Sequence, residues 1–127
     1  MTRKLFTPAE ANRSLPLVRS IVTDILDRAR ELRQQPDPPR DPREEEVREE
    51  IQQDLLGMME ELENLGASFK DWDFDVGLVD FPARIDGEDV LLCWRSDEDR
   101  VEWFHSPEGG FAARKPIPED LLHEDPN

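Results

Sequence analysis

The chain has few apolar residues, which make up 36% of its 127 residues, below the usual share for a globular domain. Its length is that of a single domain, residues 1–127, with a modest core. No stretch approaches the roughly 20 apolar residues that span a bilayer, and the opening MTRKLFTPAE lacks the apolar run of a signal peptide. We therefore expect a cytoplasmic protein that is elongated or self-associating.

Cysteine and basic residues are also scarce. The one cysteine, Cys93, excludes a disulfide within the chain. Only 16 basic residues, 3 of them Lys, stand against 31 acidic residues, which gives a net charge of -15. A field of this sign repels the phosphates of nucleic acids and of anionic lipid surfaces. Nucleic acids and membranes are therefore not expected as partners.

Two helices are predicted in the first half of the chain. TPAE at 7–10 and DPRE at 41–44 are both helix-start signals. Three prolines in QQPDPPRD separate the helices, and Gly66 follows the second one, as a C-terminal glycine should. Apolar residues recur at steps of three and four, as in helices packed along a seam: Ala11, Leu15, Val18, Val22, Ile25, Ala29 and Leu32, then Val47, Ile51, Leu55, Met58, Leu62 and Leu65. This pattern predicts an antiparallel helical hairpin over residues 8–66.

Two details of the hairpin allow alternatives. Pro16 lies inside the first helix and predicts either a kink or a second helix start capped by Ser14. Several apolar residues fall outside the seam, where a lone hairpin would expose them: Leu17, Ile21, Leu26, Leu56 and Met59. These residues should cover the sheet or pair with a second copy of the chain in a homodimer.

A β-hairpin is predicted around Asp86 and Gly87, because DG is a strong signal for a tight turn. A two-residue turn at these positions fixes which residues of the two strands pair. In this register one face of the hairpin is apolar, and the other face carries polar groups and an ion pair. A slip by one residue would mix the two faces. Val79, Phe81 and Ala83 oppose Trp94, Leu92 and Val90 on the apolar face, whereas Asp80, Pro82 and Arg84 oppose Cys93, Leu91 and Asp89 on the other.

VEWFHS at 101–106 is predicted as a third strand in one of two registers. A four-residue loop would pair Trp94 with Trp103 and put His105 on the apolar face. A shift by one residue would bring His105 to the face of Asp80 and Cys93. FAARKPI can supply a fourth, edge strand. The expected fold class is α+β: a long helical hairpin, a three- or four-stranded antiparallel sheet over 76–115 and a C-terminal tail over 116–127.

Three segments, FTPAEAN, GLVDFPARIDGEDVLLCW and WFHSPEGGFAAR, resemble in this order the bacterial family called domain of unknown function 2203. The resemblance covers nearly the whole chain. It implies a small single-domain bacterial protein and brings no settled activity or assigned catalytic residue. The matching positions of greatest interest are Asp80, Arg84, Cys93, Trp94, Trp103, His105, Gly109, Gly110 and Arg114.

Asp80, Cys93 and His105 have the chemistry of metal ligands. On one face they could hold Zn²⁺ or another transition metal, although their spacing resembles no compact metal motif. The alternative is a half-buried cysteine, a capping aspartate and a histidine packed on tryptophan. A Cys–His–Asp nucleophilic triad needs the same convergence and oxyanion donors, for which Gly109 and Gly110 could serve.

DWDFD places Asp71, Asp73 and Asp75 at alternate positions. Val76 and Pro82 stand where a calcium loop needs Gly and Glu, so the motif fails as an EF-hand. A loose divalent site or an acidic linker remains.

Trp103, Arg95 and Arg114 could form a recognition surface, because aromatic residues and Arg are favoured at interface hot spots. Trp103 could equally belong to the core, and Trp94 is expected there.

The sequence thus favours a protein-interaction module that associates with itself through the hairpin and meets an unidentified protein partner on the sheet, with no cofactor. The alternative is a divalent-metal protein or metalloenzyme using Asp80, Cys93 and His105. Enzymatic activity is not favoured.

Overall fold

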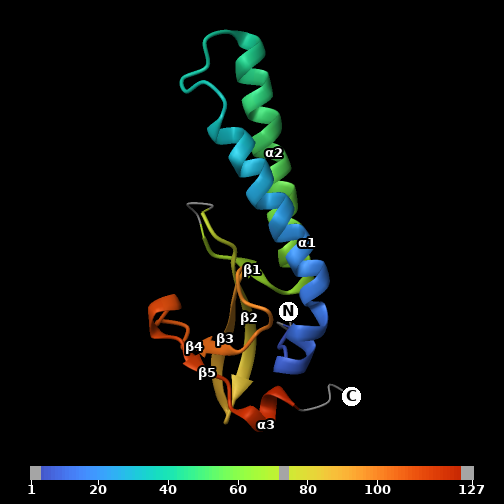
Figure 1. The fold of residues 1–127 in the computed structure, drawn as a ribbon, viewed down its shortest axis with the longest axis vertical. Helices are drawn as coiled ribbons and strands as arrows, with labels where there is room; N and C mark the ends of the chain where they lie inside the picture. Colours follow the sequence, from blue (N-terminus) through green and yellow to red (C-terminus); the bar gives the residue numbers. More distant parts are fainter. Residues whose placement is uncertain (1–3, 72–74, 124–127) are drawn as a thin grey trace.

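The fold combines a long helical hairpin with a small antiparallel sheet, which confirms the expected α+β class (Figure 1). The computed structural model describes residues 4–71 and 75–123. The helices α1 (Pro8–Arg33) and α2 (Pro42–Leu65) run side by side, and the end of the hairpin that carries their connecting loop extends well beyond the sheet. The N-terminal part of α1 lies beside the sheet (Figure 1).

The helix boundaries follow the predicted start and stop signals. At the start of α1, the Glu10 amide donates to the Thr7 hydroxyl over 3.1 Å, and the Thr7 amide donates to the Glu10 carboxylate over 2.9 Å. The second helix ends at Gly66, whose φ of 99° only glycine adopts readily. α1 is continuous through Pro16, so the separate start at Ser14 does not occur. Instead, the Ser14 hydroxyl donates to the carbonyl of Ala11.

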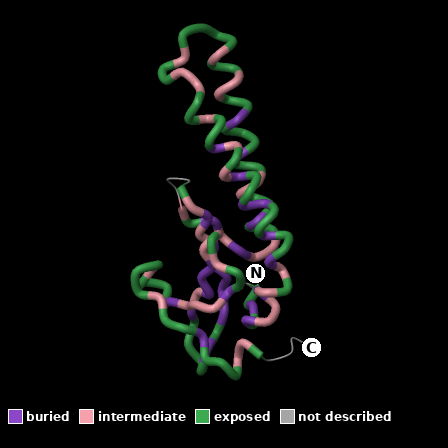
Figure 2. Tube along the Cα trace, in the orientation of Figure 1, coloured by how far each residue is buried: buried purple, intermediate pink, exposed green. Residues whose placement is uncertain are grey.

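Burial along the hairpin is uneven, as Figure 2 shows. The seam residues from Ala11 to Ala29 are buried in α1, but in α2 the buried residues are Ile51, Leu55 and Leu62. Of the apolar residues outside the seam, Ile21 is buried in the core, whereas Leu17 and Leu56 are 53% and 59% exposed. The seam is therefore used within one chain, and two large apolar side chains remain on the surface.

The sheet has five antiparallel strands in the order β1–β2–β3–β4–β5. They are β1 (Ser68–Phe69), β2 (Leu78–Ile85), β3 (Glu88–Arg95), β4 (Trp103–His105) and β5 (Lys115–Pro116). The predicted register of β2 and β3 is confirmed from Leu78 opposite Arg95 to Ile85 opposite Glu88. Asp86 and Gly87 form the turn with φ of 53° and 81°, as a tight turn of the primed type requires.

The inner face of the sheet forms the core with α1. Phe81, Leu92 and Trp94 are fully buried there, and the ring of Phe6 meets the ring of Phe81 edge-on at 5.2 Å. Just before β2, a Cβ atom on Gly77 would come within 2.3 Å of a methyl carbon of Val22. Only glycine therefore lets the chain pass this close to α1.

The register of β4 decides where His105 lies. Cys93 pairs with Trp103 and Leu91 pairs with His105, so the pairing of Trp94 with Trp103 was wrong and the shifted alternative holds. His105 is on the outer face with Asp80 and Cys93.

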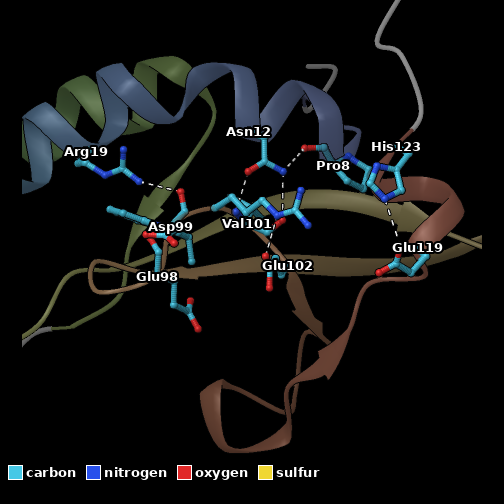
Figure 3. A network of polar contacts seen from close by, with 11 residues as sticks. Pro8, Asn12, Arg19, Glu98, Asp99, Val101, Glu102, Glu119 and His123 are labelled. Atoms are coloured by element: carbon cyan, nitrogen blue, oxygen red, sulfur yellow. Dashed lines mark hydrogen bonds and ion pairs between the residues drawn. The ribbon is translucent and has the colours of Figure 1, made fainter.

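The physical reason lies in the loop before β4. The Trp94 indole N–H donates to the Glu98 carbonyl over 3.0 Å, and the Asn12 side chain both accepts from the Val101 amide at 2.7 Å and donates to the Val101 carbonyl at 3.1 Å (Figure 3). These contacts fasten the loop to α1 and fix the residue at which β4 begins.

Both edges of the sheet differ from expectation. β1 adds a strand that was not predicted, because a two-residue strand leaves no alternating pattern in the sequence. Within FAARKPI only Lys115–Pro116 pairs, and Phe111–Ala113 forms a 3-10 turn. The predicted tail contains a short helix, α3 (Glu119–Leu122), packed near the core. No helix in the described parts of the chain is long and apolar enough to cross a membrane.

Candidate functional site

Three neighbouring strands each present one metal-ligating residue on the outer face of the sheet. Asp80 comes from β2, Cys93 from β3 and His105 from β4, and their ligand atoms all lie within 4.8 Å of one another. The three residues are only 6%, 2% and 4% exposed. They line a pocket of about 320 Å³. The structure therefore brings together the residues that the sequence singled out.

The contact of His105 with a backbone carbonyl indicates which of its ring nitrogens carries a proton. Nδ1 lies 2.7 Å from the carbonyl oxygen of Ser106. A carbonyl can only accept, so Nδ1 carries the proton. In the neutral ring, Nε2 then presents a lone pair, and it faces Oδ1 of Asp80 at 3.3 Å. A cation or a proton between these two atoms is needed to avoid an unfavourable buried contact.

Burial also sets the state of Cys93. Loss of solvent, followed by the negative charge of Asp80, raises the pKa of the Cys93 thiol to about 12. Burial likewise raises the pKa of Asp80, against the opposing effect of His105. In the absence of a metal the thiol is therefore protonated and a poor nucleophile.

The nucleophilic triad does not fit this arrangement. The ring nitrogens of His105 face Ser106 and Asp80 rather than a reactive Cys93 thiolate. The Gly109 amide donates to the Ser106 carbonyl over 3.0 Å, so it is not free to stabilise an oxyanion. Metal ligation would use the same three side chains, and it requires neither a thiolate activated by His105 nor free oxyanion donors.

The predicted recognition surface forms contacts within the chain. Arg114 makes a two-pronged ion pair with Glu98, at 3.0 and 2.9 Å, and its guanidinium lies 4.9 Å from the ring centre of Trp103 and 4.2 Å from that of Phe111. Its positive charge acts to lower the pKa of the Cys93 thiol, against the larger raising effect of burial. These contacts join the segment after β4 to the base of the pocket.

Arg95 also lies near the ring of Phe111. Its guanidinium is 5.7 Å from the ring centre of Phe111, and its Nε is 3.2 Å from a carboxylate oxygen of Asp97. Phe111 thus has an arginine near its ring from each of two segments. Its side chain is 38% exposed. Sequence reasoning identified both arginines but did not identify Phe111.

The acidic stretch DWDFD shows no converging carboxylates among its described residues. The Asp71 carboxylate accepts a hydrogen bond from the Val76 amide at 2.6 Å, and Asp75 is exposed. Asp73, with Trp72 and Phe74, lies outside the described residues. The Asp71 carboxylate is thus bonded to the backbone just before β2.

The walls of the pocket include residues that sequence reasoning missed. Lys70, Leu78, Leu91, Pro107 and Phe111 surround the three polar residues. Lys70 directly follows β1, and its amide donates to the Leu78 carbonyl over 2.8 Å. Because β1 was not predicted, nothing in the sequence placed Lys70 beside Asp80.

The fold and site define a small α+β protein with a buried Asp–Cys–His cluster on the outer face of its sheet. The family model described as an uncharacterized conserved protein (DUF2203) matches residues 4–117, and the chain belongs to this family. No curated protein and no solved structure matches the chain.

Proposed function

We propose that this protein binds a divalent transition metal, with Zn²⁺ the best fit, through Asp80, Cys93 and His105. A carboxylate oxygen, a thiolate and an imidazole nitrogen are the ligand types that Zn²⁺ takes. Three protein ligands leave a fourth position, which would open into the pocket. Such a site would be maintained in the cytoplasm, where the thiol stays reduced.

The observation that carries the proposal is the buried contact between His105 and Asp80, which needs a proton or a cation between its two atoms. His105 directs Nε2 toward Asp80 at 3.3 Å while its Nδ1 is held by Ser106 at 2.7 Å. A backbone carbonyl that fixes the far nitrogen is the usual support of a metal-bound histidine. The two side chains are only 4% and 8% exposed, so bulk solvent screens the contact weakly.

The spacing is compatible with zinc after a small closure. Ligand atoms about 2.0–2.3 Å from a tetrahedral ion lie about 3.3–3.8 Å apart. The present atoms lie within 4.8 Å of one another, so shifts of about 1 Å, within the reach of side-chain rotation, would complete the set. Deprotonation of Cys93 would accompany binding.

Isothermal titration of the reduced protein with Zn²⁺ tests the proposal. We expect one equivalent to bind, and we expect His105→Ala and Cys93→Ser to weaken binding at least 100-fold. His123→Ala is the matched control, because His123 lies on the surface and pairs with Glu119. Binding that survives both site variants, or that is lost in the control, would contradict the proposal.

A second candidate function is self-association through the hairpin, which the exposed Leu17 and Leu56 favour. The hairpin extends beyond the sheet (Figure 1), so a second copy could pack on it and bury both leucines. The same interaction role would include an unidentified protein partner that binds at Trp103, Arg95 and Arg114. Such a partner would have to pack around the existing contacts of these residues with Phe111 and Glu98.

Light scattering over a wide concentration range checks the homodimer. Leu55 is buried in the seam of its own chain, so a charge there would unfold the monomer; Leu56→Glu is the better probe. We expect twice the chain mass for the wild type and a monomer for Leu56→Glu. Gln52→Glu adds the same charge at an exposed position one turn earlier on the same face of α2 and should weaken the dimer less than Leu56→Glu, because no apolar side chain is lost. A wild type that stays monomeric at high concentration would refute self-association.

A further inference from the structure

We propose that the open position of the metal site takes the carboxylate of a small organic acid with a short apolar chain. This inference rests on the metal site proposed above and adds the class of ligand. It follows from the charge at the base of the pocket and from the character of its walls.

The charges at the base of the pocket favour a monoanion. A divalent ion would neutralise Asp80 and the thiolate of Cys93, and Lys70 contributes one more positive charge at the rim. Lys70 makes no ion pair with any residue in the described part of the chain. Its positive charge acts to lower the pKa of Asp80, against the larger raising effect of burial. One carboxylate, with one oxygen on the metal and the other near Lys70, balances this arrangement.

A phosphate fits the pocket less well. Arg114, whose charge acts on Cys93, already donates both of its terminal nitrogens to Glu98, at 3.0 and 2.9 Å. Among the described residues that line the pocket, Lys70 is the one Lys or Arg that a phosphate dianion would find, whereas phosphate sites gather several donors.

The walls of the pocket are apolar beyond this base. Leu78, Leu91, Pro107 and Phe111 surround the opening. A second pocket of about 410 Å³ shares Leu91 and Pro107 with the first and continues past Leu5. The first pocket, of about 320 Å³, has room by itself for a chain of several carbons. Mostly apolar walls with a few polar groups at one end are typical of small-ligand sites.

The test uses the full chain loaded with Co²⁺, whose visible absorption reports changes among its ligands. We expect acetate, butyrate and hexanoate to alter the spectrum, with affinity rising about two- to fourfold for each added methylene. Hexanamide, of the same length but neutral, should leave the spectrum unchanged. Lys70→Met should weaken all three acids about three- to tenfold, and Lys70→Arg should restore most of the loss.

The outcomes separate this inference from the metal site itself. If Co²⁺ does not bind in the wild type, the metal proposal fails and this inference fails with it. If Co²⁺ binds but the acids leave its spectrum unchanged, the carboxylate inference alone is overturned. The inference is also overturned if inorganic phosphate binds more tightly than hexanoate, or if affinity does not grow with chain length.

Discussion

The two faces of the sheet differ sharply, although the same three strands build both. The inner face carries Phe81, Leu92 and Trp94, which have no exposed surface and pack against α1. The outer face, one residue along each strand, carries Asp80, Cys93 and His105, which are almost equally buried. Burial alone therefore does not distinguish the faces; the chemistry of the buried groups does.

A gain in folding stability explains the buried residues of the inner face but not those of the outer face. Apolar side chains gain free energy on burial. A carboxylate and an imidazole lose hydration there and regain it only through good partners. Asp80 and His105 offer each other a contact of 3.3 Å that needs a shared proton or a cation. Apolar residues at these positions would serve the fold at least as well, which is the reason for proposing a binding function for the outer face.

Removal of the largest inner side chain should have the greatest effect on stability. Trp94→Ala is expected to lower the free energy of unfolding by about 3–5 kcal/mol, because it leaves a cavity beneath α1 and frees the Glu98 carbonyl. Urea denaturation followed by far-ultraviolet circular dichroism measures this loss. A loss below about 1 kcal/mol would mean that the inner face is not the core.

Loss of the contact between Asn12 and Val101, which sets the register of β4, should have the second-largest effect on stability. Asn12→Ala removes three hydrogen bonds, to Pro8 and to both backbone groups of Val101 (Figure 3). We expect a loss of about 1–3 kcal/mol in unfolding free energy, since the Val101 amide is left buried without a partner. Asn12→Asp keeps the acceptor for that amide and should retain part of the stability. Equal stability of Asn12→Ala and the wild type would exclude this role.

The proposed role of the outer face predicts that zinc affinity depends on pH. Zinc must displace the proton of Cys93, whose pKa of about 12 keeps the thiol protonated near neutrality. Zinc affinity should therefore rise about tenfold per pH unit between pH 6 and 8, about 1.4 kcal/mol per unit. Competition with a chromophoric chelator measures this slope, and Cys93→Ser should flatten it. A flat profile in the wild type would contradict thiolate ligation.

The smallest effect is expected at the exposed end of the same face. Arg84 and Asp89 form an ion pair at 3.0 Å with side chains 56% and 69% exposed. Arg84→Ala should cost at most about 1 kcal/mol, and less at high salt, because solvent screens such pairs. Thermal unfolding at two ionic strengths checks this. A loss comparable to that of Asn12→Ala would show that exposed groups of the outer face also stabilise the fold.

Sequence patterns predicted the elements with strong local signals. Helix caps and seam spacing placed both helices, and the Asp86–Gly87 turn fixed the register of β2 and β3. Each signal lies within a few residues of the structure that it determines.

The elements that sequence reasoning left open depend on distant contacts. The register of β4 is set by Asn12, which lies 89 residues from Val101, and no local pattern could choose between the two possible pairings. The ligand cluster depended on that choice. Lys70 and Phe111 reached the pocket through a two-residue strand and a 3-10 turn, which have no periodic signature.

X-ray absorption at the zinc edge of the zinc-loaded protein tests the central claim most directly. The account predicts one sulfur at about 2.3 Å and nitrogen or oxygen ligands at about 2.0–2.2 Å, with the sulfur absent in Cys93→Ser. His123→Ala should give the wild-type spectrum. A shell of oxygen and nitrogen alone in the wild type would contradict a zinc site built from Asp80, Cys93 and His105.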